Sequence, residues 1–177
     1  YFMCYNNWDF NANFGFLCSF WRLLNHKFEK KRAMFSKTTE YGIRAAIFVA
    51  SESHQNKRSG LKDIAKKIDS PEAFTAKIMQ ILTKNKLIDS VKGVGGGFEI
   101  PTERLSQIKL SQIVNALEGD RVFKGCGLGL STCSEEHPCP MHDKFKSIRN
   151  DLSNMLENTT LEELTLGLKT GDTFLRY

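Results

Sequence analysis

The chain has 177 residues, of which 41% are hydrophobic and 25% are charged, and its formal net charge is +5. A chain of this length buries one ordinary core and hardly two full domains. Because no run of about eighteen apolar residues offers a membrane span, we expect a cytoplasmic protein without a membrane partner.

The positive charge is concentrated between residues 56 and 93, where nine Lys or Arg side chains stand against four Asp or Glu. From Leu105 onward, eight basic side chains stand against ten acidic ones. A basic segment beside a mildly acidic one favours a polyanionic partner for the basic segment. A solvated lysine-rich surface has the same charge distribution, so charge alone does not identify a DNA-binding protein.

Residues 1–33 differ in composition from the rest, because they contain ten of the nineteen aromatic residues and both tryptophans. Their basic cluster follows the apolar residues, which is the wrong order for a secretory signal peptide. Met34 begins a well-formed segment. We therefore expect residues 1–33 to be an appendage outside the fold, either translated upstream sequence or an aromatic docking arm.

Apolar residues at three-to-four spacing predict a helix from about Thr38 to Ser53 and a short amphipathic helix over residues 61–68. A third helix follows after a short turn. Ser70 is its predicted N-cap, Pro71 suits the first helical position, and Glu72 favours the positive end of the helix dipole. The stripe that this helix is expected to bury consists of Phe74, Ile78, Ile81 and Leu82.

The opposite face of the third helix carries small or polar side chains near its start, which leave room for a partner to approach closely. Two short helices joined by a tight turn in this way predict a helix-turn-helix, although plain helical hairpins share the pattern. We expect Thr75 and Lys77 to contact bases or phosphates. The whole predicted surface consists of Pro71, Glu72, Ala73, Thr75, Ala76 and Lys77.

A β-hairpin is predicted directly after the third helix, with glycines from Gly93 to Gly97 at its tip. In that place a hairpin is the wing of a winged helix-turn-helix. We expect Lys92, Gly93 and Gly95 to follow the DNA backbone or enter the minor groove. A nucleotide-binding loop is disfavoured, because the Walker pattern places a lysine after its glycines and a dinucleotide fingerprint opens a helix.

Two longer helices are predicted beyond a short one that ends at Gly119. The first carries Met141, Phe145, Ile148, Leu152, Met155 and Leu156 at three-to-four spacing. We expect a second copy of the chain to pack against this stripe of apolar residues, and packing on the chain's own winged helix is the alternative. The last helix is capped by Thr159 or Thr160. The predicted domains are a winged helix-turn-helix domain at residues 34–120, a cysteine-containing loop at 121–142, and a dimerisation helix with the C-terminal segment at 143–177.

The segment 121–142 contains the spacing Cys126-x6-Cys133-x5-Cys139-x2-His142. A disulfide framework is disfavoured, since nothing marks the chain for export and three local cysteines leave one unpaired. A catalytic cysteine lacks other recognisable machinery. Zinc sites usually use tighter pairs, so the two wider gaps favour an iron–sulfur cluster over zinc. Redox-active thiols without a metal are a third alternative.

The order of these motifs resembles the Rrf2 family of bacterial transcription regulators, in particular its IscR- and NsrR-like iron–sulfur members. The resemblance rests on "MFSKTTEYGIRAA", "LKDIAKKIDSPEAFTAKIMQILTKNKLI", "VKGVGGGF", the three-cysteine loop and "TTLEEL". It implies a mainly α fold with a small β-hairpin wing, namely a winged helix-turn-helix followed by a long C-terminal dimerisation helix. It also implies a homodimer that binds double-stranded DNA at a pseudo-palindromic operator.

The resemblance further implies that an iron–sulfur cluster alters the affinity for DNA. Cys126, Cys133 and Cys139 match the three thiolate ligands of the family. His142 resembles the fourth ligand of 2Fe–2S members and is favoured, whereas Glu40 matches the carboxylate that some 4Fe–4S members supply from the other subunit. Three alternatives to this reading are a zinc-stabilised repressor, a thiol-redox repressor and an adaptor that no longer binds DNA. No enzyme activity is expected.

Overall fold

The computed structural model describes residues 34–175, apart from the side chain of Lys169. The chain divides into the units Tyr1–Met34 and Phe35–Tyr177, and every element below belongs to the second. The expected appendage, residues 1–33, lies outside the described residues. No helix between residues 34 and 175 is both long enough and apolar enough to cross a membrane.

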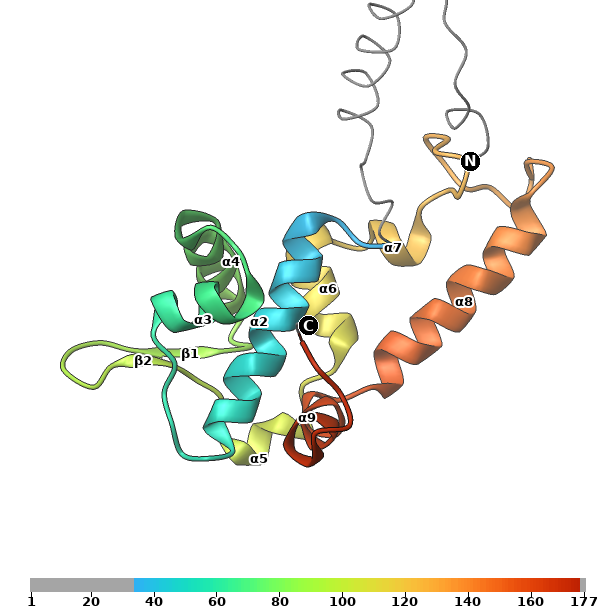
Figure 1. The fold of residues 1–177 in the computed structure, drawn as a ribbon. Coiled ribbons are helices and arrows are strands. Elements are labelled where there is room, and N and C mark those ends of the chain that lie inside the picture. Colours follow the sequence, from blue (N-terminus) through green and yellow to red (C-terminus); the bar gives the residue numbers. More distant parts are fainter. Residues whose placement is uncertain (1–33, 176–177) are drawn as a thin grey trace, which may run out of the picture. The chain divides into compact units, whose positions relative to one another are not determined.

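The first part of this unit contains three helices and a hairpin, which together we call the winged-helix segment (Figure 1). Their bounds are α2 Lys37–Ser53, α3 Leu61–Ile68, α4 Glu72–Lys84, β1 Asp89–Val91 and β2 Gly97–Glu99. The two strands are antiparallel, with Ser90 opposite Phe98. Ser59 lengthens this small sheet, because its N–H and carbonyl both bond to Phe98, at 3.0 and 2.9 Å.

The turn between α3 and α4 differs from the prediction. Asp69 adopts a left-handed conformation with φ of 55°, and the N–H of Ser70 donates to the carbonyl of Ala65 at 3.0 Å. This is the hydrogen bond that closes a Schellman ending. Ser70 therefore finishes α3, and Pro71 is the N-cap of α4, whose carbonyl accepts from Phe74 and Thr75. The predictions of Ser70 as the cap and of Pro71 as the first helical residue were wrong.

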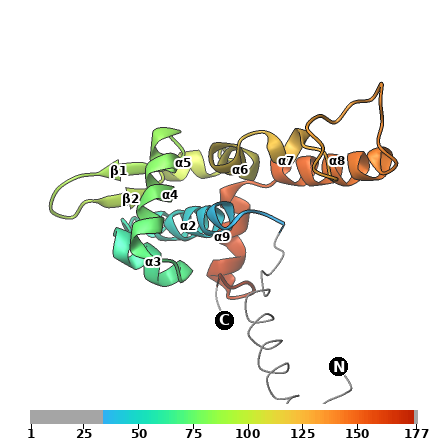
Figure 2. The ribbon, with the colours of Figure 1, turned by 90° about the horizontal axis from the view of Figure 1, so that it is seen from above.

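The second part of the unit is also helical. Its elements are α5 Thr102–Leu105, α6 Leu110–Glu118, α7 Arg121–Lys124, α8 His142–Asn158 and α9 Leu161–Thr170. Both α6 and α9 pack on α2, and α8 contacts α6 and α7 (Figure 2). Thr160 caps α9 by accepting a hydrogen bond from the N–H of Glu163 at 3.2 Å. It is one of the two residues that were predicted as the cap. The short helices α5 and α7 were not predicted, because a helix of four residues is too short for its apolar residues to show a helical period.

One apolar core joins these elements around α2. Its fully buried members include Val49, Ile64, Ile78, Leu82, Ile113, Leu156 and Leu161. The last two come from the end of α8 and the start of α9, so the C-terminal helices complete the core of the winged-helix segment. The expected fold class, mainly helical with a small hairpin wing, is confirmed.

Candidate DNA interface and cysteine loop

The helix α4 buries one face and exposes the other. Ile78, Met79 and Leu82 are fully buried, which anchors the helix on the core. The exposed residues are Pro71, Glu72, Ala73, Lys77, Gln80 and Lys84, and Ala76 is half-buried. The predicted contact surface is therefore accessible, with one exception.

That exception is Thr75, which is fully buried. Its hydroxyl donates to the carbonyl of Pro71 at 3.1 Å. Thr75 lies three and four residues before Ile78 and Met79, so it shares their inward face. The prediction that Thr75 contacts DNA was wrong, because its hydroxyl suggested a polar surface position that the helical period does not allow.

Sequence reasoning missed Gln80 on the accessible face. It lies three residues after Lys77 and seven after Ala73, so the same period that places those two residues also places Gln80. Its amide offers both a donor and acceptors, the groups that bind adenine edges in other complexes. Extending the exposed stripe by one more turn would have found it.

A cation on α2 lies close to the start of α4. The guanidinium carbon of Arg44 is 4.6 Å from the centre of the Tyr41 ring. That ring in turn meets Phe74 of α4 edge to face, with ring centres 5.8 Å apart. Stacking of this kind holds the guanidinium beside α4 while leaving its N–H groups available to a phosphate. The sequence did not predict this stacking of Arg44 on Tyr41.

The tip of the hairpin exposes the backbone of its glycines to solvent. Gly93 and Gly95 have φ of 96° and 74°, and an added Cβ at either would meet no atom within 4 Å. Lys92 and Val94 on either side of Gly93 are exposed. Positive φ explains the glycines, and the open space allows another backbone to come close. The predicted wing residues are thus accessible together at one tip.

Arg58 supports this wing from the segment before α3. Its Nε donates to Glu99 of β2 at 2.8 Å, and its Nη1 reaches the carbonyl of Gly95 at 3.4 Å. The hydrogen bond to Glu99 raises the pKa of the guanidinium above its usual value. Arg58 therefore braces the hairpin in its folded position, and part of its charge is balanced by Glu99.

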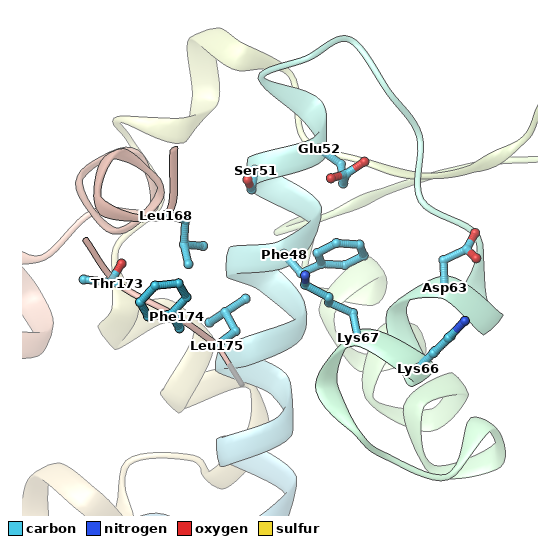
Figure 3. Close-up of a pocket in the computed structure, with 10 residues that line it drawn as sticks. All are labelled: Phe48, Ser51, Glu52, Asp63, Lys66, Lys67, Leu168, Thr173, Phe174 and Leu175. Atoms are coloured by element: carbon cyan, nitrogen blue, oxygen red, sulfur yellow. The ribbon is translucent and has the colours of Figure 1, made fainter. Parts of the chain in front are cut away.

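A cleft of about 560 Å³ lies between α2, α3 and the chain that follows α9 (Figure 3). Phe174 and Leu175 lie on one side, with Phe48 and Lys67 on the other. The cleft includes none of the predicted DNA or cluster residues. Lys66 and Lys67 at its edge are exposed, so solvent reaches their charges directly.

The cysteine loop, residues 125–141, leads into α8. Its three cysteines are half-buried free thiols, and His142 begins α8 with only 6% of its surface exposed. The Sγ of Cys133 lies 3.5 Å from Nδ1 of His142. The Nε2 of the same ring is buried and has no hydrogen-bond partner in the described part of the chain. An unpartnered buried ring nitrogen is available to a metal.

The other two cysteines also lie near each other. The pKa of Cys126 is lowered by the backbone N–H groups of Leu128 and Leu130 and, to a smaller extent, by the thiol of Cys139. A lowered pKa favours the thiolate, which is the form that binds metals. The four predicted ligands thus stand as two neighbouring pairs, one with Cys126 and Cys139 and one with Cys133 and His142.

Comparison with known proteins identifies the family. The model for Rrf2, described as an iron-dependent transcriptional regulator, matches residues 35–166. The chain belongs to the Rrf2 family. It is a DNA-binding transcriptional regulator and not an enzyme. The transcriptional regulator NsrR of Oceanobacillus iheyensis is 27% identical over 129 residues, which cover 72% of this chain and 86% of the relative.

Two solved structures of similar proteins have the same fold as this chain. The global cysteine regulator CymR of B. subtilis superposes with a TM-score of 0.61 and 23% identity, covering 75% of this chain and 95% of CymR. IscR of T. potens gives a TM-score of 0.62 and 20% identity, covering 78% of this chain and 90% of that one. These likenesses confirm the winged-helix architecture of this Rrf2 protein.

The donor types in the loop fit an iron–sulfur cluster. Thiolates with an occasional imidazole are the usual ligands of such clusters. Within residues 34–175, no group of three or more His, Cys, Asp or Glu side chains is close enough to hold a single metal ion.

The alternative fourth ligand, Glu40, lies in the first turn of α2 and forms an ion pair with Lys37. No described contact joins it to the cysteine loop of the same chain. Its proposed role depends on a second subunit, so it stays a prediction.

Proposed function

We propose that this Rrf2 regulator acts in the cytoplasm as a homodimer and that a 2Fe–2S cluster controls its affinity for a pseudo-palindromic operator. Cys126, Cys133, Cys139 and His142 are the proposed ligands. The observation that carries the proposal is the contact of 3.5 Å between Cys133 and His142, because it joins the cysteine loop to the first residue of α8. The buried and unpartnered Nε2 of His142 supports it.

The DNA surface consists of α4 and the wing. On α4 we propose Pro71, Glu72, Ala73, Ala76, Lys77 and the exposed Gln80, and on the wing Lys92, Gly93 and Gly95. A helix whose exposed N-terminal face carries small side chains fits the major groove, and a glycine tip with a lysine fits the phosphate backbone or minor groove. Two such units in a dimer would read two half-sites one helical turn apart.

The exposed apolar side chains of α8 support the dimer. Ile148 is 62% exposed and Met155 is 46% exposed, although both are large and apolar. They lie seven residues apart on one face of α8, and Met141 precedes them on that face. Leu156 instead enters the core, so this end of the predicted apolar stripe packs on the chain's own winged helix. A second copy of α8 would cover the exposed part.

The proposed control works through α8. When bound, the cluster supplies a centre that responds to redox change or nitric oxide. His142 belongs to α8, and the same helix presents the proposed dimer face. A change in how the loop is held on α8 would therefore alter the relation between the two subunits and the spacing of their α4 helices.

Anaerobic purification tests the cluster directly. We expect a coloured protein with about two iron and two sulfide ions per chain. A colourless protein with stoichiometric zinc would defeat the cluster and favour the zinc-stabilised alternative. Cys133→Ala should remove the colour while the far-ultraviolet circular dichroism of the helices is retained. Spectra before and after nitric oxide would identify the signal.

A further inference from the structure

Arg149 of α8 contacts the cysteine loop at two separated points. Its Nη1 donates to the carbonyl of Gly125 at 3.0 Å and lies 3.5 Å from the Sγ of Cys133. Gly125 directly precedes Cys126, and Cys133 is the next cysteine along the chain. One side chain therefore ties the start and the middle of the loop to the same position on the helix.

The other residues on this side of α8 also meet the loop. His142 lies seven residues before Arg149, which is two helical turns, and it contacts Cys133. Phe145 lies between them, and its ring is so close to Gly127 that an added Cβ there would stand 2.4 Å from ring atoms. This loop-facing side of α8 is distinct from the exposed apolar side at Ile148. The helix thus holds the loop on one side and offers its proposed dimer face on another.

Arg149 forms no short ion pair within the part of the chain that the structure describes, although its charge does act on Glu135 from a distance. The neighbouring Lys146, by contrast, is paired with Glu135 of the loop, and that ion pair lowers the pKa of Glu135. A guanidinium that donates to sulfur has its natural counter-charge in a thiolate or in an anionic cluster. Hydrogen bonds and charges around ligand sulfurs are among the features that set the properties of a bound cluster.

We propose that Arg149 is a positioning residue of the cluster site, which holds the Sγ of Cys133 beside His142 and fastens the loop to α8. The inference rests on the proposed function for its consequence at the cluster, whereas the fastening of the loop is a property of the metal-free chain. One experiment therefore tests how Arg149 fastens the loop, and a second tests its effect on the cluster.

The first experiment uses the metal-free full chain and measures hydrogen exchange by mass spectrometry. Arg149→Gln should increase the exchange rate of amides in residues 125–133 several-fold and leave those of α2 and α4 unchanged. Lys144→Gln removes one positive charge from an exposed position on the same helix and should change neither region. Unchanged exchange in the loop of Arg149→Gln would overturn the fastening role, whether or not a cluster is ever bound.

The second experiment uses the anaerobically reconstituted protein and measures its visible spectrum and reduction potential. Loss of a positive charge and of a hydrogen bond at a ligand sulfur should make the cluster harder to reduce in Arg149→Gln. Arg149→Lys keeps the charge and should give a potential between those of the wild type and of Arg149→Gln. A merely structural tether would lower the yield of loaded protein without moving the potential of the loaded fraction.

These results distinguish failure of the inference from failure of the proposed function. A wild-type protein that takes up no iron defeats the proposed cluster, and loop exchange alone then decides the role of Arg149. A wild type with a cluster whose spectrum, potential and loop exchange are unaffected by Arg149→Gln defeats the inference and leaves the cluster in place.

Discussion

Buried apolar side chains hold the winged-helix segment together, whereas mainly polar contacts from α8 hold the cysteine loop. In the first region Ile64, Ile78 and Leu82 are fully buried. In the second, Leu128 and Leu130 are more than half exposed, and the contacts come from Arg149, Lys146 and His142. The winged-helix segment thus belongs to one packed core that α6, α8 and α9 complete, whereas the loop has a low cost of rearrangement. Such a difference suits the proposed function, in which a rigid winged-helix segment binds DNA and the cysteine loop changes conformation.

The largest expected effect tests the difference in stability. Ile78→Ala should lower the free energy of unfolding by about 2–5 kcal/mol, because it removes a buried side chain from the core. Leu128→Ala in the loop, where the side chain is 52% exposed, should change it by less than about 0.5 kcal/mol. Urea unfolding followed by circular dichroism measures both. Equal losses would show that the loop is as tightly packed as the core.

The next effect concerns the dimer face of α8. Ile148→Asp should weaken self-association by about thirtyfold, since a charge replaces an apolar side chain at the centre of the proposed contact. Asn150→Asp lies on the exposed polar side of the same helix and is the matched control. Sedimentation velocity measures both. If Ile148→Asp dimerises as well as the control, the face on α8 is not the interface.

A smaller effect is expected at the DNA surface. Lys77→Gln on α4 and Lys92→Gln on the wing should each weaken DNA binding by about tenfold. A phosphate contact should also lower the slope of affinity against salt by about one unit. Lys144→Gln removes the same charge from α8 and should leave both quantities unchanged. Fluorescence anisotropy across a salt series distinguishes these outcomes, and unaltered affinity in both variants would remove α4 and the wing from the interface.

The smallest effect concerns Cys126 in the metal-free protein. Backbone N–H groups lower the pKa of its thiol. The thiolate of Cys126 should therefore persist to lower pH than the thiolate of an ordinary cysteine, whose pKa is about 8.5. Its alkylation rate should therefore fall off at a lower pH than that of glutathione as the solution is acidified. Mass spectrometry of the Cys126 peptide gives the rate. A midpoint at or above that of glutathione would contradict the described loop geometry.

The two regions also differ in how far the sequence predicts them. Helical period and glycine placement predict α2, α3, α4 and the wing, since packing against one core imposes those patterns. The same period should have excluded Thr75 from the surface, and it places Gln80 there. Helix capping was less predictable, because the hydrogen bond from Ser70 to Ala65 depends on how α3 ends.

In the cysteine loop, only the ligand types and their order could be read from the sequence. The contacts of Arg149 with Gly125 and Cys133 join residues 24 and 16 positions apart across an irregular loop. No period relates such positions. Their proximity follows from the path of the loop back along α8, which composition and spacing do not encode. The contact between Cys133 and His142 also depends on the path of the loop and was likewise not predicted.

The most direct test of the central claim measures DNA affinity with and without the cluster. The protein would first select its operator from random duplex DNA. Anisotropy titrations would then compare the anaerobically loaded protein, the same sample after removal of iron by a chelator, and Cys133→Ala. We predict that loaded and metal-free proteins differ at least tenfold in affinity and that Cys133→Ala matches the metal-free form. Equal affinity in all three samples would contradict control by the cysteine loop.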